Sequence, residues 1–181
     1  MVVFGPYGGT LMILYHRIPP NLRGNVLHPM NTLRDTYPDI YEECRRSYSG
    51  REFLMEEIIA PLNCLWNDVI FMAAVTPSSL FTAMENAGLP RPRDIQAACI
   101  DSEMLDPSRM TVVSEMDINK PQIYERFEPN KEKQYAEVPA RTIDYWQKAY
   151  ARGQRVLYWM HIPHILYCGS IDITDVPRVS S

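Results

Sequence analysis

The sequence predicts an α+β fold, a single domain in which a mixed sheet of about five to seven strands packs against three or four helices. A chain of 181 residues is long enough for one buried core. Its 46% hydrophobic and 22% charged residues are typical of a globular protein. The chain contains both segments with helical periodicity and short apolar runs, and this combination favours the α+β class. We expect this domain to span 11–176, between a flexible lead-in at 1–10 and a frayed tail at 177–181.

Four segments are expected to form helices. The clearest begins at Thr76, whose hydroxyl can cap a helix with Pro77 at its first position and Gly88 at its end. The last of the four, 139–152, would bury Ile143, Trp146 and Tyr150. The other two helices are expected at 35–48 and 51–59.

Short apolar runs predict the strands, which we place at 11–18, 64–66, 69–75, 95–100, 110–116, 156–160 and 170–173. The run Val156–Met160 is apolar at both odd and even positions, which predicts a central strand covered on both faces. The charged stretch 117–136 carries two prolines and predicts a surface excursion or a lid.

Composition excludes several classes of protein. The net charge is −4 and no run of Lys or Arg is present, so we expect no extended nucleic-acid partner. The four cysteines are widely spaced and are expected to be reduced. The chain has neither a secretory pattern at its start nor an apolar run of roughly 20 residues, so we expect a soluble cytoplasmic protein with no membrane contact. The oligomeric state stays open.

Histidines are the main catalytic candidates. His16, His161 and His164 interrupt the most apolar stretches of the chain, and a neutral imidazole can exchange protons near neutral pH. The H-x-x-H pair could hold a metal on a helix. Pro163 and the strand-forming neighbours favour an extended chain, which sends the two rings to opposite faces, so no metal is expected. Histidines that only bond backbone carbonyls are the alternative.

Substrate-binding candidates surround two of these strands. Tyr15 and Arg17 end the first strand, and the guanidinium of Arg17 can bind a carboxylate or phosphate with two hydrogen bonds, unless it pairs with a helix carboxylate. Trp66, Asn67 and Asp68 interrupt another apolar run. Asn67 and Asp68 could form a two-residue hairpin turn; otherwise Asp68 would be buried, with the raised pKa of a general base.

Two segments resemble the ends of the ADP-ribosyltransferase fold of DarT-type proteins. They are Leu14–Arg17 in the first strand and Ile162–Ile165 with the residues that follow to Gly169. The resemblance implies NAD as a substrate, held by His16 or Arg17. In that superfamily a glutamate just before the late strand region orients the ribose, whereas His161 stands at that place here.

These observations predict a small soluble enzyme that acts on a polar small molecule, a nucleotide or amino-acid derivative, with transferase chemistry favoured. His16, His161 or His164 would supply acid/base chemistry, Arg17 would anchor an anionic group, and Asp68 would orient or activate. The residues themselves identify no cofactor. One alternative is an ADP-ribosyltransferase that uses NAD. The other is a non-catalytic protein-interaction module, which the eleven tyrosines and the charged 117–136 segment would suit.

Overall fold

The computed structural model describes residues 12–117 and 120–181. It has the predicted α+β class. The strands form four separate sheets rather than one mixed sheet, and every strand pairing among the described residues is antiparallel. The expected lead-in at 1–10 lies outside the described residues.

The largest sheet has four strands in the order β5 (Val69–Met72), β9 (His164–Cys168), β7 (Met110–Val113) and β8 (Tyr124–Glu125). In β9 the side chains from His164 to Tyr167 are buried, because β9 has a neighbouring strand on each side and is covered on both faces. His164, its first residue, lies opposite Val113 of β7.

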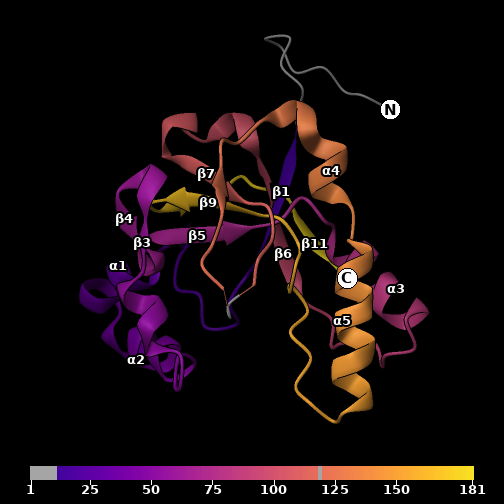
Figure 1. The fold of residues 1–181 in the computed structure, drawn as a ribbon. Helices are drawn as coiled ribbons and strands as arrows, with labels where there is room; N and C mark the ends of the chain where they lie inside the picture. The colour runs from indigo at the N-terminus through magenta and orange to yellow at the C-terminus, as the bar shows by residue number, and fades with distance from the viewer. Residues whose placement is uncertain (1–11, 118–119) are drawn as a thin grey trace.

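A second sheet positions the first strand of the protein. It contains β1 (Ile13–Arg17), β6 (Gln96–Asp101) and β11 (Arg178–Ser180) in that order. Figure 1 shows β1 and β6 crossing the direction of β5 and β9 near the centre of the molecule. Two hydrogen bonds join the sheets there, from Tyr15 N–H to Ala73 O at 2.8 Å and from Ala73 N–H to Tyr15 O at 3.1 Å. The end of β1 therefore lies against the end of β5.

Two smaller sheets and five helices complete the described structure. The sheets pair β2 (Val26–Leu27) with β10 (Ile171–Asp172) and β3 (Ile58–Ile59) with β4 (Cys64–Leu65). The helices are α1 (Met30–Thr36), α2 (Pro38–Arg46), α3 (Pro77–Asn86), α4 (Glu132–Ala136) and α5 (Ala140–Ala151). In Figure 1, α1 and α2 lie on the side of β3 and β4, whereas α3 and α5 lie together on the other side.

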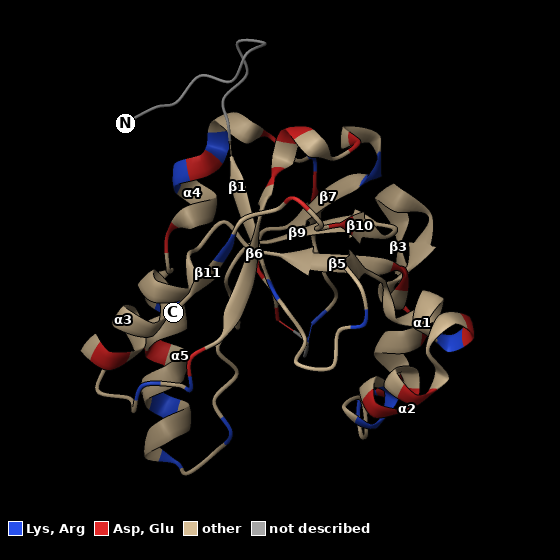
Figure 2. Ribbon diagram, turned by 180° about the vertical axis from the view of Figure 1, so that it is seen from behind, with Lys and Arg blue, Asp and Glu red and all other residues tan. Residues whose placement is uncertain are grey.

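Apolar side chains fill the space between these elements. One buried cluster joins the two large sheets, a second joins α3 to α5 through residues such as Phe81 and Trp146, and a third lies under β3 and β4. Figure 2 shows charges along α2, α4 and α5, and none on β5 or β9. Within the described part of the chain, no helix combines the length and apolar character that a bilayer crossing requires.

The helix predictions are confirmed where the sequence signals come from residues next to the helix ends. α3 begins after Thr76, whose side-chain oxygen accepts the Ser79 N–H, and α5 lies within the predicted 139–152. Tyr150 of α5 is 52% exposed, so its predicted burial is wrong. The helix expected at 35–48 is present in part, as α2, and it starts later than predicted because Pro38 forces a break at Tyr37 between α1 and α2. The segment 51–59 forms a 3₁₀ turn at Glu52–Glu56 followed by β3.

Several strand predictions fail because distant partners decide the outcome. Asn67 and Asp68 form no hairpin turn; they lie in a 3₁₀ turn at Trp66–Asp68, with β4 paired to β3 and β5 paired to β9. The expected strand at 156–160 is a run of turns instead, and the central strand is β9. The strand expected at 170–173 is shorter than predicted: it is β10, which pairs with β2.

Two predictions of loose segments are wrong. The 117–136 segment is not only a surface excursion or lid, because it contributes β8 and α4 and buries Phe127 and Tyr135 in the main core. The tail at 177–181 contains β11, which pairs with β6 from Arg178 to Ser180. The pairing of β8 with β7 and of β11 with β6 supplies order that local composition does not indicate.

Candidate functional site

His16 and His164 line the same pocket. The pocket has a volume of about 190 Å³ and lies where β1 ends, β5 ends and β9 begins. Its lining is Tyr15, His16, Arg17, Phe71, Met72, Ala73, Trp159 and His164. The bridge between Tyr15 and Ala73 brings β1 to this place, and the pairing of β5 with β9 brings His164.

The ring of His16 is fixed by a backbone carbonyl. Its Nδ1 lies 2.7 Å from Phe71 O. A carbonyl oxygen can only accept a hydrogen bond, so Nδ1 carries the proton and Nε2 keeps a free lone pair. Burial lowers the pKa of His16, and the hydrogen bond to Phe71 opposes this only in part. The ring is therefore neutral at pH 7.

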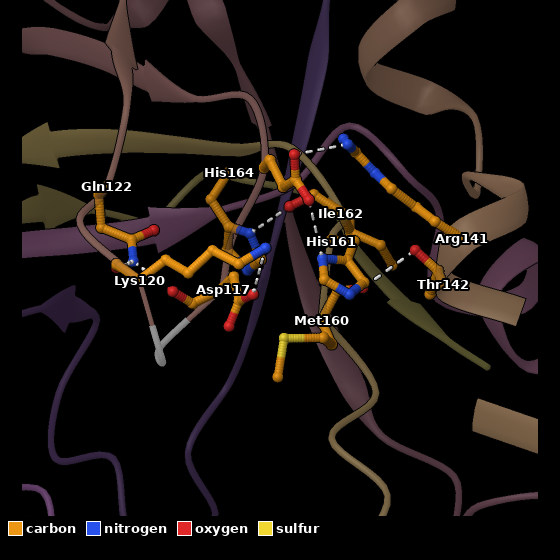
Figure 3. Close-up of polar contacts among 10 residues, drawn as sticks. Asp117, Lys120, Gln122, Arg141, Thr142, Met160, His161, Ile162 and His164 are labelled. Carbon is orange, nitrogen blue, oxygen red and sulfur yellow. Dashed lines mark hydrogen bonds and ion pairs between the residues drawn. The ribbon is translucent and has the colours of Figure 1, made fainter. Parts of the chain in front are cut away.

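His164 has the same arrangement, supplied by a different carbonyl. Its Nδ1 lies 2.8 Å from Ile162 O (Figure 3). The residue is only 8% exposed, and the rings of Phe71 and Trp159 stand edge-on to it at centroid distances of 6.4 and 6.0 Å. Burial lowers the pKa of His164 to about 4, although the hydrogen bond to Ile162 acts in the opposite direction. Its Nε2 is likewise an unprotonated acceptor.

Arg17 connects this pocket with a larger cavity. The second cavity has a volume of about 570 Å³, and its lining shares Arg17 and Trp159 with the histidine pocket. Arg155 and the exposed rings of Tyr150 and Tyr158 also line it. Within the described residues, neither Arg17 nor Arg155 has a carboxylate partner, so the salt bridge considered for Arg17 is not formed there. Both guanidinium groups are available to an anionic ligand.

Tyr15 contributes a neutral phenol. It lines the histidine pocket, and burial raises its pKa, followed by smaller effects of Cys99 and Glu132. A phenol with a raised pKa stays protonated at neutral pH and can donate a hydrogen bond to a substrate.

His161 belongs to a separate cluster. Its backbone is in the left-handed region, with φ at 61°, and its N–H donates to Met116 O at 2.8 Å. Its ring Nδ1 lies 3.3 Å from Glu115 Oε1, and the other oxygen of Glu115 pairs with Arg141 at 2.6 Å. In Figure 3, His161 lies on the side of Arg141 and Thr142, and His164 lies near Asp117 and Lys120.

The two rings of the H-x-x-H pair therefore have different partners. No group of three His, Cys, Asp or Glu side chains suited to a metal ion occurs in 12–117 or 120–181. This arrangement gives the H-x-x-H spacing no support as a metal site.

Asp68 caps a turn away from the histidine pocket. One of its oxygens accepts a hydrogen bond from Asn31 Nδ2 at 2.7 Å, and the other accepts from Leu65 N–H at 2.9 Å. The residue is only half-buried, so the deep burial that would make it a base is not found. The first oxygen therefore links the 3₁₀ turn to α1, and the second caps the turn itself.

Trp66 and Asn67 also lie outside the lining of the histidine pocket. The Trp66 ring contacts the ring of Phe71 at a centroid distance of 4.8 Å, and so supports a pocket residue from behind. Asn67 is 2% exposed, and its side-chain nitrogen and oxygen have no hydrogen-bond partner among the described residues.

Sequence reasoning missed Phe71, Trp159, Arg155 and Arg141, the partner of Glu115. Phe71 and Trp159 were interpreted as core residues of strands. Arg155 precedes a segment that was expected to be a strand, so nothing in its neighbourhood pointed to a cavity. An aromatic pair, Tyr158-Trp159, shortly before Pro163 was the available signal for a turn that lines a site.

Comparisons with known proteins leave the site to be judged on its own geometry. No protein-family model, curated protein or solved structure matches the chain.

Proposed function

We propose that this protein is a small enzyme that acts on a polar small molecule by histidine acid/base chemistry, with His16 and His164 as the proton-transferring residues. One observation carries the proposal: two neutral imidazoles, each with its proton held on Nδ1 by a backbone carbonyl, line the same pocket. Each leaves Nε2 free to accept a proton from a substrate O–H or N–H group and to return it later.

The neighbouring cavity supports a small-molecule substrate. Its volume of about 570 Å³ lies within the usual range for ligand sites, and its aromatic lining with a few cationic groups is typical of them. Arg17 would hold an anionic group of the substrate at the boundary of the two cavities, and Tyr15 would donate a hydrogen bond beside His16. The substrate class includes nucleotide and amino-acid derivatives. A cytoplasmic location agrees with four free thiols.

A second candidate, ADP-ribosyl transfer from NAD, is supported by one contact. The resemblance to that fold lacks a glutamate just before Ile162, where His161 stands. The carboxylate of Glu115, which follows β7, lies 3.3 Å from the His161 ring, and the next residue, Met116, lines the larger cavity. A glutamate near the late strand region is thus available from another part of the chain. Under this candidate, NAD is a substrate and Glu115 takes the ribose-orienting role.

The test is a thermal-shift screen of the wild-type protein against NAD, nucleotides, amino acids and divalent metals, followed by turnover assays on any compound that binds. We expect a ligand that raises Tm in the wild type and in the matched control His28→Ala, which changes a half-buried histidine bonded to Ser170 outside the histidine pocket. Arg17→Ala should lose most of the shift. His164→Gln and His16→Gln should keep binding and lose turnover.

Two outcomes would overturn the proposal. If no compound raises Tm, or if Arg17→Ala, His16→Gln and His164→Gln behave like His28→Ala in both binding and turnover, the acid/base site fails and the interaction module becomes the better account. If NAD alone gives the shift, and Glu115→Gln abolishes turnover but not binding, the second candidate replaces the first.

A further inference from the structure

The histidine pocket is small, and two hydrogen-bond acceptors line it. Its volume of about 190 Å³ is below the roughly 300 to 1,000 Å³ that a whole ligand occupies, so it takes one functional group of a larger molecule. His16 and His164 each keep an unprotonated Nε2, because a backbone carbonyl holds the proton on Nδ1. A hydroxyl has one hydrogen to donate, whereas an amino group has several. A single group that serves both imidazoles is therefore an amino group.

The lining of the same pocket determines which charge can accompany that amino group. None of the described residues that line it is acidic, and the rings of Phe71 and Trp159 lie 6.4 and 6.0 Å from the His164 ring, between centroids. Aromatic rings attract an ammonium group without neutralising it. Arg17 also lines the pocket and has no carboxylate partner within the described residues. The ligand must therefore carry its own negative group, close enough to its amino group to reach Arg17.

The larger cavity supplies space for an apolar ligand body. It has a volume of about 570 Å³ and shares Arg17 and Trp159 with the histidine pocket. Aliphatic and thioether side chains such as Met84, Leu89 and Met160 make up most of its lining. Its described lining residues include no Asp, Glu, Asn, Gln, Ser or Thr, so the hydroxyl groups of a ribose would lose water and gain no such partner. This lining favours an apolar body over a nucleotide.

We propose that the ligand of these two cavities is an apolar α-amino acid, with its amino group at His16 and His164, its carboxylate on Arg17 and its side chain in the larger cavity. This arrangement follows from Arg17, which lines both cavities. Because the amino group and the carboxylate of an α-amino acid share one carbon, a ligand at this boundary reaches both sets of residues. The inference rests on the proposed acid/base site and narrows its substrate class from nucleotide and amino-acid derivatives to apolar amino acids.

Calorimetric titration of the wild-type protein with L-leucine, L-methionine, L-phenylalanine and L-tryptophan tests the proposal. Each amino acid that binds is compared with two analogues of the same side chain, one without the amino group and one without the carboxylate. For phenylalanine these are 3-phenylpropanoate and 2-phenylethylamine. We expect at least one of the amino acids to bind, and both of its analogues to bind about tenfold more weakly, because each has lost one of the two anchored groups.

Variants assign the two groups of the ligand to residues. Arg17→Ala should weaken binding of the amino acid about tenfold and bind the amine analogue no more weakly than the wild type does. His164→Leu removes an acceptor and should bind the amino acid only as well as its deaminated analogue. His164→Gln keeps an acceptor oxygen and should retain the preference for the amino acid. Unchanged binding of the deaminated analogue by His164→Leu would show that its cavity is intact.

Three outcomes would overturn the proposal. They are no binding of any of the four amino acids, equal affinity of the wild type for an amino acid and its deaminated analogue, and a His164→Leu variant that still distinguishes the two as the wild type does. The acid/base site would survive them if another compound binds and its turnover is lost in His16→Gln and His164→Gln. Conversely, the expected binding pattern without turnover of any bound amino acid would support the ligand class and overturn the acid/base function.

Discussion

At the scale of single residues, the properties of His16 and His164 depend on two carbonyl oxygens. Phe71 O and Ile162 O accept hydrogen bonds from the two Nδ1 atoms, so each ring has one tautomer and one free acceptor. A neutral histidine in a buried position resists protonation, because its charged form would lose the hydration that water provides. The same feature that leaves each ring with a free acceptor therefore makes the folded state sensitive to acid.

The first prediction concerns this acid sensitivity. His164 has a pKa of about 4 in the folded protein and an ordinary value of 6.5. Below pH 6.5 the unfolded chain binds a proton that the folded chain does not, so stability falls until about pH 4 and then levels off. The expected loss from this residue is about 3 kcal/mol, and His16 acts in the same direction. Urea unfolding as a function of pH measures the loss.

His164→Gln removes the titrating group and should flatten the stability profile between pH 6.5 and pH 4. His28→Gln, which changes a half-buried histidine outside the histidine pocket, should keep the wild-type slope. A wild-type slope in His164→Gln would show that His164 does not have a lowered pKa.

At the scale of elements, α5 shapes the wall of the larger cavity. The Thr142 hydroxyl donates to Met160 O at 3.0 Å, Trp146 Nε1–H donates to Leu157 O at 3.3 Å, and the Tyr145 hydroxyl accepts Leu157 N–H at 3.2 Å. These bonds satisfy backbone groups of 157–160 that a strand partner would otherwise satisfy. They explain why an apolar run that resembles a strand is a set of turns, with Trp159 facing the histidine pocket.

The second prediction tests this wall. Thr142→Val keeps the side-chain shape and leaves the carbonyl of Met160 without its donor, which should lower stability by about 1 to 3 kcal/mol. The affinity of any ligand of the larger cavity should fall as well, because Met160 and its neighbours would lose their support. Chemical unfolding and a binding titration measure the two effects. Full stability together with full affinity would contradict the assigned role of α5.

Local signals explain which elements could be predicted from the sequence. The cap at Thr76, Pro77 and the stop at Gly88 are all properties of neighbouring residues, and α3 formed as predicted. The turn around His161 depends on donors from α5 and on a positive φ that no local pattern indicates. Likewise, the sequence identifies His16 and His164 as candidates but cannot show that they meet, because the Phe71 carbonyl that orients His16 is 55 positions away.

At the scale of the whole molecule, the site depends on two crossing sheets. The bridge between Tyr15 and Ala73 joins the sheet of β1 and β6 to the sheet of β5 and β9, and the histidine pocket lies at this junction. Charged residues are concentrated on the outer helices (Figure 2), whereas the strands at the junction are apolar apart from the site residues. The candidate site therefore lies where apolar strands of the two large sheets meet.

The third prediction follows from this arrangement. Backbone amides of β9 at 164–168 should exchange with deuterium most slowly, since β9 is the central strand of the largest sheet and is almost wholly buried. The exposed β11 at 178–180 should exchange much faster, although it is paired with β6. Equal protection of the two strands, measured by hydrogen–deuterium exchange, would contradict the view that the junction is the most stable part of the fold.

The measurement that most directly tests the central claim is a ¹⁵N–¹H NMR correlation of the histidine rings at pH 6.5, with His28, which lies outside the histidine pocket, as the reference. The account predicts that His16 and His164 are neutral, carry their proton on Nδ1, and have an Nε2 signal that shifts when a substrate or competitive ligand binds. A proton on Nε2 of either ring, or a doubly protonated ring at that pH, would contradict the claim that two prepared acceptors line one pocket.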